Sequence, residues 1–329
     1  DYSNLCSFRV PDEKDRALAI GTIVGEKFTL KKSLNALIPF FEGINKPEKG
    51  DWLFEMEEDG QTYDVYRSAF INKLSPEKST IYLAPLEADF DLDLLKNIQK
   101  LVAAYYPKCT VKLHKAIKVD GIEDLKKYDD YRGKDQYEAG QLLQKLKPKV
   151  SKDTFCLMTL TTKDLYYVRK TARFGPEEEQ VLNWVFGLAT LRDRVGVFSF
   201  DRISEDMFPS KVDISDPINY LHACAKIVLH EIGHMFGMKH CIYFKCLMNG
   251  CNSPWELWRA PLLLCPVCVR KLQYNMEFNF QERYENLAKT TADFGGKFLE
   301  DAKKYQELAD AIAASLNSIG KPKTTIKKQ

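Results

Sequence analysis

Apolar and polar positions alternate along the middle of the chain in a pattern that predicts strands and helices in turn. Strand-like segments lie at 81–84, 110–113, 116–119 and 155–160, and helix-like segments lie at 92–105 and 136–146. The apolar run at 155–160 is continuous, which is typical of a strand buried on both faces. Strands separated by helices of about ten residues indicate a largely parallel sheet. We therefore expect an α/β fold, in the broad sense that includes α+β, from Ser79 onward.

This alternation changes after residue 182, where two apolar runs follow one another without a helix between them. Residues 183–190 and 195–200 flank the polar triplet 192–194. Such spacing predicts a hairpin or an antiparallel strand added to the edge of the sheet. The expected sheet is therefore mixed, with one antiparallel edge strand.

The first 78 residues show a different pattern and predict a separate N-terminal layer. Residues 30–41 have helical apolar spacing, although Pro39 interrupts it near the end. Segments 52–56 and 62–66 flank Asp59-Gly60, and this arrangement predicts a β-hairpin.

The last part of the chain predicts one long amphipathic helix. Apolar residues from Phe298 to Ile319 recur at alternating spacings of four and three, and Gly320 and Pro322 end the pattern. We expect this seam to pack on the protein's own body, with a partner helix as the alternative. The predicted organisation is an N-terminal extension at 1–78, a catalytic domain at 79–290, and a C-terminal helix with a basic tail at 291–329.

Composition and charge narrow the range of partners. The formal net charge is +2, so the chain has no general electrostatic attraction to nucleic acids. No apolar run reaches the ~18 residues that a membrane helix needs. We therefore expect no nucleic-acid partner and no membrane association. We also expect a monomer.

The nine cysteines point to metal binding rather than to a disulfide framework. Nine is an odd number, and five of the nine fall between Cys241 and Cys268. This grouping favours a reducing compartment. We expect the cytoplasm, with the nucleus as the alternative.

Three of the five histidines lie within the segment 230–240, HEIGHMFGMKH. His230 and His234 are one helical turn apart and face the same side, so both can bind one ion. Gly237 lets the chain leave the helix through a left-handed turn, which brings His240 back as a third ligand. Three protein ligands leave the fourth zinc position open, and this is the arrangement of catalytic zinc.

The helix that carries these histidines has a clear predicted start. Asp216 suits the N-cap and Pro217 the first helical position. His222 lies two turns before His230, roughly 12 Å along the axis, which is too far to share the ion. We interpret His222 as structural.

Glu231 is the candidate general base. It follows the first histidine directly, so its carboxylate can reach a water molecule activated by the zinc and take its proton. Amide hydrolysis is the reaction class that this arrangement predicts. A helix whose histidines merely pack is the alternative, but five specified residues in this order make that interpretation much weaker.

Cys241, Cys246, Cys265 and Cys268 form a Cys-x4-Cys pair and a later Cys-x2-Cys pair. Four thiolates of this kind are typical of a closed, structural zinc site. Reduced core cysteines are the alternative. Cys251 competes with these four for one ligand position.

The stretch from residue 230 to 268 resembles the signature of the archaemetzincins, a family of the metzincin clan of zinc proteases. The residues that match its catalytic part are His230, Glu231, His234, Gly237 and His240, and those that match its second zinc site are Cys241, Cys246, Cys265 and Cys268. Met248 lies where the family has the methionine of the Met-turn, an apolar floor beneath the catalytic zinc.

The resemblance implies a metzincin fold, in which a twisted mixed sheet lies over an active-site helix. It also implies a zinc metallopeptidase with two zinc ions, one catalytic and one structural, that acts on peptide or protein substrates. An aminopeptidase and an endopeptidase both remain open. A zinc-stabilised interaction protein with vestigial hydrolysis is the alternative, supported by the N-terminal extension and the C-terminal helix.

In such enzymes the antiparallel edge strand lies along the cleft and pairs with an extended peptide. The candidate substrate-binding residues here are Phe186, Gly187, Leu188 and Ala189. An ordinary edge strand is an equally weighted interpretation.

Overall fold

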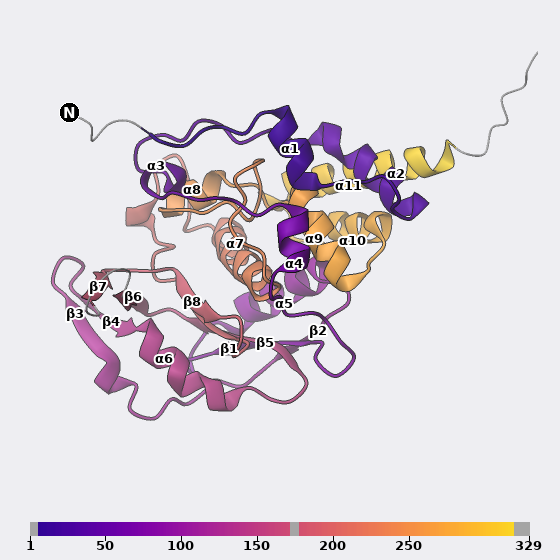
Figure 1. Cartoon of the computed structure of the whole chain (residues 1–329). Helices are drawn as coiled ribbons and strands as arrows, with labels where there is room; N and C mark the ends of the chain where they lie inside the picture. The colour runs from indigo at the N-terminus through magenta and orange to yellow at the C-terminus, as the bar shows by residue number, and fades with distance from the viewer. Residues whose placement is uncertain (1–5, 172–177, 319–329) are drawn as a thin grey trace, which may run out of the picture.

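The structure is a computed structural model that describes residues 6–171 and 178–318 (Figure 1). Its main sheet has five strands in the order β2-β1-β5-β9-β8. Their bounds are β1 Thr80–Pro85, β2 Thr110–Leu113, β5 Thr154–Thr161, β8 Gly187–Thr190 and β9 Val195–Ser199. Strands β2, β1, β5 and β9 run parallel, and β8 is antiparallel to β9. The predicted mixed sheet with an antiparallel edge strand is confirmed.

Helices cover both faces of this sheet because its strands are apolar on both sides. In β5, Cys156, Met158 and Leu160 face one core cluster, which also holds α5 (Leu92–Tyr105) and α7 (Pro217–Met235). Leu157 of the same strand faces the other cluster, with α6 (Ala139–Leu146). Figure 1 shows α6 and α7 on opposite sides of the sheet.

The sequence pattern missed a second, smaller sheet with the order β3-β4-β6-β7. Its strands are β3 Lys126–Asp129, β4 Lys134–Glu138, β6 Asp164–Thr171 and β7 Glu178–Leu182. Strand β3 reads Lys-Lys-Tyr-Asp and is mostly exposed, so it shows no apolar alternation.

Two predicted boundaries near this sheet were wrong. Residues 136–138 belong to β4, and α6 begins only at Ala139, where the Glu138 carboxylate accepts bonds from the amides of Gly140 and Gln141 at 3.1 and 2.5 Å. Residues 116–119 are not a strand. This segment is connected to β1 by a hydrogen bond from the Ile117 amide to the Pro85 carbonyl at 2.9 Å.

The predicted hairpin around Asp59-Gly60 was also wrong. The two flanking segments form short helices instead, α3 (Trp52–Glu55) and α4 (Tyr63–Ser68), and Thr62 caps α4 by accepting from the Val65 amide at 3.2 Å. The predicted helix at 30–41 is present as α2 (Phe28–Leu37), and Pro39 lies in a 3-10 turn at Ile38–Phe40. A further helix, α1 (Glu13–Ile20), precedes it.

The C-terminal helix packs on the protein itself. Helix α11 (Phe298–Asn317) contacts α10 (Phe280–Ala292) and α2, and its buried seam is Phe298, Ala302, Tyr305, Leu308, Ala309 and Ile312. The predicted packing of this seam is therefore confirmed. Ile319, Gly320, Pro322 and the basic tail lie outside the described residues. The boundaries at 78 and 290 stay a prediction, although α2 and α11 share one core with the middle of the chain.

Helices α8 (Pro254–Arg259) and α9 (Pro266–Met276) lie between α7 and α10 in the sequence. Within 6–171 and 178–318, no helix combines the length and the apolar character that crossing a membrane requires.

Candidate metal centres

Helix α7 carries the first two histidines and begins as predicted. Asp216 accepts bonds from the amides of Ile218 and Asn219 at 2.8 and 3.0 Å, and Pro217 occupies the first turn. At the other end, the Met238 amide bonds to the Gly233 carbonyl at 3.2 Å, and Gly237 has φ of 88°. A side chain would be strained in this left-handed conformation, so glycine allows the chain to reverse here.

The reversal brings His230, His234 and His240 together, with one ligand nitrogen from each within 4.8 Å of the others. The Nε2 atoms of His230 and His234 are 2.9 Å apart. Each of the three rings makes a hydrogen bond through Nδ1 to an oxygen acceptor. These acceptors are the Leu247 carbonyl at 2.8 Å, the Met238 carbonyl at 2.7 Å and a Glu58 carboxylate oxygen at 2.7 Å.

These hydrogen bonds decide which ring nitrogen carries the proton. A carbonyl or carboxylate oxygen accepts, so Nδ1 donates and each Nε2 presents a lone pair. Two lone pairs 2.9 Å apart repel each other unless a cation lies between them. Burial lowers the pKa of His234 to about 4 and that of His230 well below its usual value, so both rings are neutral. Neutral imidazoles with anchored Nδ1–H groups fit a zinc ion.

Glu231 follows His230 on the same helix, and its side chain is partly buried. Burial raises the pKa of the Glu231 carboxyl to about 8. A zinc cation nearby acts in the opposite direction and favours the carboxylate. Burial and a nearby cation therefore act on the pKa of Glu231 in opposite directions, as is common for residues that transfer protons.

Met248 lies directly against the active-site helix. A Cβ atom on Gly233 would be 2.5 Å from the Met248 sulfur, so this glycine leaves the space that the methionine fills. Met248 is fully buried, and its carbonyl accepts a bond from the Cys241 amide at 2.7 Å. This position suits an apolar floor beneath the histidines.

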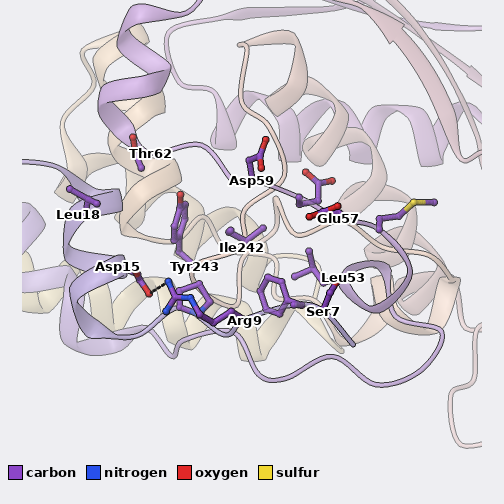
Figure 2. Close-up of a pocket in the computed structure, with 14 residues that line it drawn as sticks. Ser7, Arg9, Asp15, Leu18, Leu53, Glu57, Asp59, Thr62, Ile242 and Tyr243 are labelled. Atoms are coloured by element: carbon purple, nitrogen blue, oxygen red, sulfur yellow. Dashed lines mark ion pairs between the residues drawn. The ribbon is translucent and has the colours of Figure 1, made fainter. Parts of the chain in front are cut away.

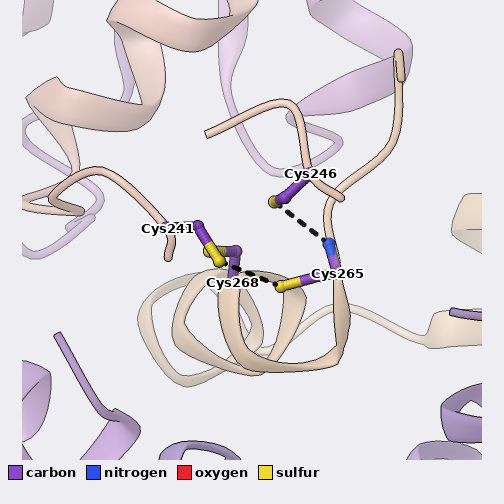
Figure 3. Close-up of side chains that lie close together, drawn as sticks. All are labelled: Cys241, Cys246, Cys265 and Cys268. Carbon is purple, nitrogen blue, oxygen red and sulfur yellow. Dashed lines mark hydrogen bonds between the residues drawn. The ribbon is translucent and has the colours of Figure 1, made fainter. Parts of the chain in front are cut away.

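Four cysteine sulfurs form a second cluster, shown in Figure 3. Cys241, Cys246, Cys265 and Cys268 are at most 2% exposed, and the sulfurs of Cys241 and Cys265 are 3.6 Å apart. The amides of Cys265 and Met248 donate to the Cys246 sulfur at 3.3 and 3.4 Å. Hydrogen bonds from the other three cysteines hold the pKa of the Cys241 thiol well below its usual range, whereas burial raises the pKa of the Cys246 and Cys265 thiols.

The local backbone also favours thiolates in this cluster. Cys265 is the N-cap residue of α9 and Cys268 lies in its first turn, where the helix dipole favours negative charge. Cys251 lies outside the cluster, and its sulfur contacts the Asn249 carbonyl at 3.7 Å. Four buried sulfurs with this support fit a structural zinc ion.

The turn at residues 246–249 contacts both the histidine cluster and the cysteine cluster. Leu247 accepts the His230 hydrogen bond, while its neighbours Cys246 and Met248 are tied into the cysteine cluster. Asn249 holds the turn closed, because its side chain donates to the Cys241 carbonyl at 2.6 Å and accepts from the Cys246 amide at 2.8 Å. The two clusters are therefore connected through one short turn of backbone.

Glu58 and Trp52 are residues that the sequence pattern did not identify. The Trp52 indole donates to the same Glu58 oxygen that His240 uses, at 2.9 Å, and its ring meets the edge of the His240 ring at 5.0 Å between centroids. Glu58 is 182 residues before His240, in a run of acidic residues. A carboxylate partner of a ligand has no fixed sequence spacing, so no signal marks it.

The same segment lines a pocket of about 330 Å³ (Figure 2). Glu57 and Asp59 lie on one side of it, and Arg9 and Asp15 form an ion pair at 2.7 Å on another. Ile242 and Tyr243, which follow the third histidine, lie between them. Glu58 also lines this pocket, so it is the residue that joins the pocket to the histidines.

The predicted substrate strand corresponds to β8, which lies at the edge of the main sheet beside β9. The backbone N–H and C=O groups of Phe186 and Leu188 point toward β9. The Ser199 amide donates to the Phe186 carbonyl at 2.7 Å, and hydrogen-bonded pairs alternate along an antiparallel strand. The backbone groups of Gly187 and Ala189 therefore point away from β9. A Cβ atom on Gly187 would be 2.1 Å from the Phe198 ring, so the close pairing requires glycine.

His222 lies away from the histidine cluster. Its Nε2 atom is 2.9 Å from an Asp301 carboxylate oxygen, which ties α7 to α11. His114 contacts the carbonyl of its neighbour Lys115 at 2.8 Å. These two histidines take no part in either cluster.

Comparisons with known proteins show what this chain is similar to. The sequence model described as peptidase family M54 matches residues 98–274. Archaemetzincin-2 of Macaca fascicularis is 30% identical over 298 residues, covering 82% of this chain and 79% of the relative, and archaemetzincin-2 of Homo sapiens gives the same values. The solved archaemetzincin from Methanopyrus kandleri is 26% identical with a TM-score of 0.46, covering 62% of this chain and 99% of the other.

Proposed function

Because this chain belongs to peptidase family M54, the archaemetzincins, a family of zinc metallopeptidases, we propose that His230, His234 and His240 hold its catalytic zinc ion. The observation that carries the proposal is the pair of Nε2 atoms 2.9 Å apart. Their Nδ1 atoms are already committed to carbonyl oxygens, so the lone pairs that face each other are free for a metal.

The chain's own residues then perform the proton transfers. Zinc bound at this site supplies Lewis-acid activation of water and of the substrate carbonyl. Glu231 accepts the proton of the attacking water and donates it to the departing amine. Glu231 is placed for both transfers because it follows His230 directly on α7.

We further propose that Cys241, Cys246, Cys265 and Cys268 hold a second, structural zinc ion. The support is a closed set of four buried sulfurs at the start of α9. These thiolates require reducing conditions, so the proposal places the protein in the cytoplasm, with the nucleus as the alternative.

An extended peptide can pair with β8 through the backbone groups of Gly187 and Ala189, which β9 leaves free. This is the proposed binding mode for a peptide or protein substrate. The zinc chemistry applies equally to an endopeptidase and to an aminopeptidase. Only a substrate with a blocked N-terminus separates the two.

A zinc-stabilised interaction protein remains the second candidate, but one of its supports is gone. The apolar seam of α11 packs on α10 and α2, so it does not offer a free face for a partner helix. The intact Glu231 beside the histidines favours hydrolysis over binding alone.

The proposal is tested with a mixed peptide library, half of it N-terminally acetylated, incubated with the purified chain. We expect cleavage, and we expect Glu231→Ala to lower the rate by about 10²–10⁴-fold while it keeps its zinc, because Glu231 moves a proton and is no ligand. Zinc content is measured on the same samples by mass spectrometry. Zinc-loaded protein that cleaves no peptide, or a Glu231→Ala variant that cleaves at the parent rate, would contradict the proposal.

A further inference from the structure

The turn at residues 235–240, which carries the third histidine, is contacted at most of its residues by side chains from the segment 58–72. This segment, which we call the brace, lies outside the part of the chain matched by the family model. At the start of the turn, the Asn72 side chain donates to the Met235 carbonyl at 3.1 Å and the Tyr66 hydroxyl donates to the Phe236 carbonyl at 2.9 Å. Both contacts are buried.

The brace continues along the turn to the ligand itself. Gln61 donates to the Gly237 carbonyl at 3.2 Å and accepts from the Lys239 amide at 3.1 Å. Glu58 then accepts from His240 Nδ1 at 2.7 Å. The Met238 carbonyl, which the brace does not contact, is used by His234.

The brace is itself fixed from behind. Gln61 is 3% exposed, and its side-chain oxygen accepts from Lys271 of α9 at 3.1 Å. The Asn275 side chain, also on α9, donates to the Asn72 carbonyl at 2.8 Å. Ile71 fills the space beside Gly237, where a Cβ atom would be 2.6 Å from its side chain. The contacts to the turn are therefore made from a rigid support.

His240 depends on this support more than the other two histidines do. His230 and His234 are held by α7. Their Nδ1 atoms bond to carbonyls that are close in the sequence, those of Leu247 and Met238. His240 lies beyond the end of the helix, and its Nδ1 partner is a carboxylate from the N-terminal segment. The Trp52 indole donates to the same carboxylate oxygen at 2.9 Å and helps to hold it in place.

We propose that Glu58 is a positioning residue for the third zinc ligand, so that the N-terminal segment is an integral part of the active site. This inference rests on the proposed zinc site. A carboxylate that accepts the Nδ1 proton fixes the tautomer and the orientation of the ring and makes Nε2 a better donor to the metal. Loss of such a partner commonly costs about 10–100-fold in metal affinity or activity.

The test compares Glu58→Ala, Glu58→Gln and the control Glu57→Gln in the full chain. Zinc affinity of the histidine site is measured by competition with a chromophoric chelator, and kcat/KM is measured on a cleaved peptide. We expect Glu58→Ala to weaken zinc binding by about 10–100-fold. Glu58→Gln keeps an acceptor without the charge, so its affinity falls between those of the parent and Glu58→Ala. Glu57 is exposed and adjacent, so Glu57→Gln keeps the parent affinity.

Thermal unfolding with and without zinc separates positioning from a general structural role. A positioning role lowers the extra stability that zinc adds, whereas a structural role lowers both melting temperatures equally. Parent zinc affinity in Glu58→Ala, or an equal loss in Glu57→Gln, would overturn the inference. Weakened zinc binding in a chain that cleaves no peptide would support the inference while it rejects the peptidase proposal.

Discussion

Gly233 lies between the two clustered histidines of α7 and leaves room for Met248. We expect Gly233→Ala to lower the free energy of unfolding by about 1–3 kcal/mol, because the new methyl group would meet the Met248 sulfur at 2.5 Å in a fully packed region. Chemical denaturation of the zinc-loaded protein measures this.

The double variant Gly233→Ala/Met248→Ala is the control, because it removes the sulfur that the new methyl group meets. The two single effects should then add up to more than the effect of the double variant. Strict additivity would mean that Met248 does not pack on Gly233 as described.

At this scale, sequence reasoning identified groups whose spacing is fixed by local geometry. The histidines at positions 230 and 234 obey the helical repeat, and Gly237 obeys the rule for a left-handed turn, with φ of 88°. Glu58 obeys no such rule, because it reaches His240 through tertiary packing. A residue that supports a ligand from a distant segment is visible only in the fold.

The turn from Cys241 to Asn249 connects the two metal clusters at the scale of one structural element. We expect Cys246→Ser to weaken zinc binding at the histidine site by about 10–100-fold, although Cys246 does not contact that site. The reason is that Met248 bonds to the Cys246 sulfur, and the neighbouring Leu247 holds His230. Chelator competition measures the affinity.

Cys251→Ser is the matched control for this prediction. Cys251 is close in sequence, but its sulfur lies outside the cluster and contacts the Asn249 carbonyl. The control should keep the parent affinity. If Cys251→Ser abolishes zinc binding while Cys246→Ser leaves it intact, the assigned cysteine set is wrong; if neither changes it, the coupling is wrong.

Element prediction succeeded where one periodicity dominates. Helix α5 has the predicted bounds, 92–105, because its apolar stripe packs on one core and Asp91 caps it. The hairpin at Asp59-Gly60 failed: residues 57–62 form an irregular segment between α3 and α4, in which Gly60 has φ of 71°. Its flanking segments bury Leu53 and Tyr66 against the rest of the core instead of pairing with each other. The second sheet was missed because β3, β4 and β7 are mostly polar, and the apolar run 165–168 of β6 shows no alternation.

At the scale of the whole molecule, helices from the N-terminal and the C-terminal parts of the described residues pack over the same core. Helix α2 contacts α11, and α4 contacts α9, which contains the clustered Cys268 and has Cys265 as its N-cap. The sequence predicted an N-terminal layer but not its contact with the histidine turn. Contacts between segments about 180 residues apart depend on the global path of the chain, which local patterns do not contain.

Two ligand clusters in one chain lead to a direct prediction of metal content. We expect two zinc ions per chain, one at the histidines and one at the cysteines. The histidine-bound ion should leave first under a chelator, because its open position admits a competing ligand, while four buried sulfurs enclose the other.

The most direct test of the account is zinc content followed together with peptide hydrolysis during brief chelator treatment and zinc re-addition. We predict that the zinc content falls from two ions to one per chain, that hydrolysis disappears with that first ion, and that added zinc restores both. A chain that still hydrolyses peptide after losing the first ion would contradict the account. So would a chain that binds a single zinc ion and has all its cysteines open to a thiol reagent in the native state.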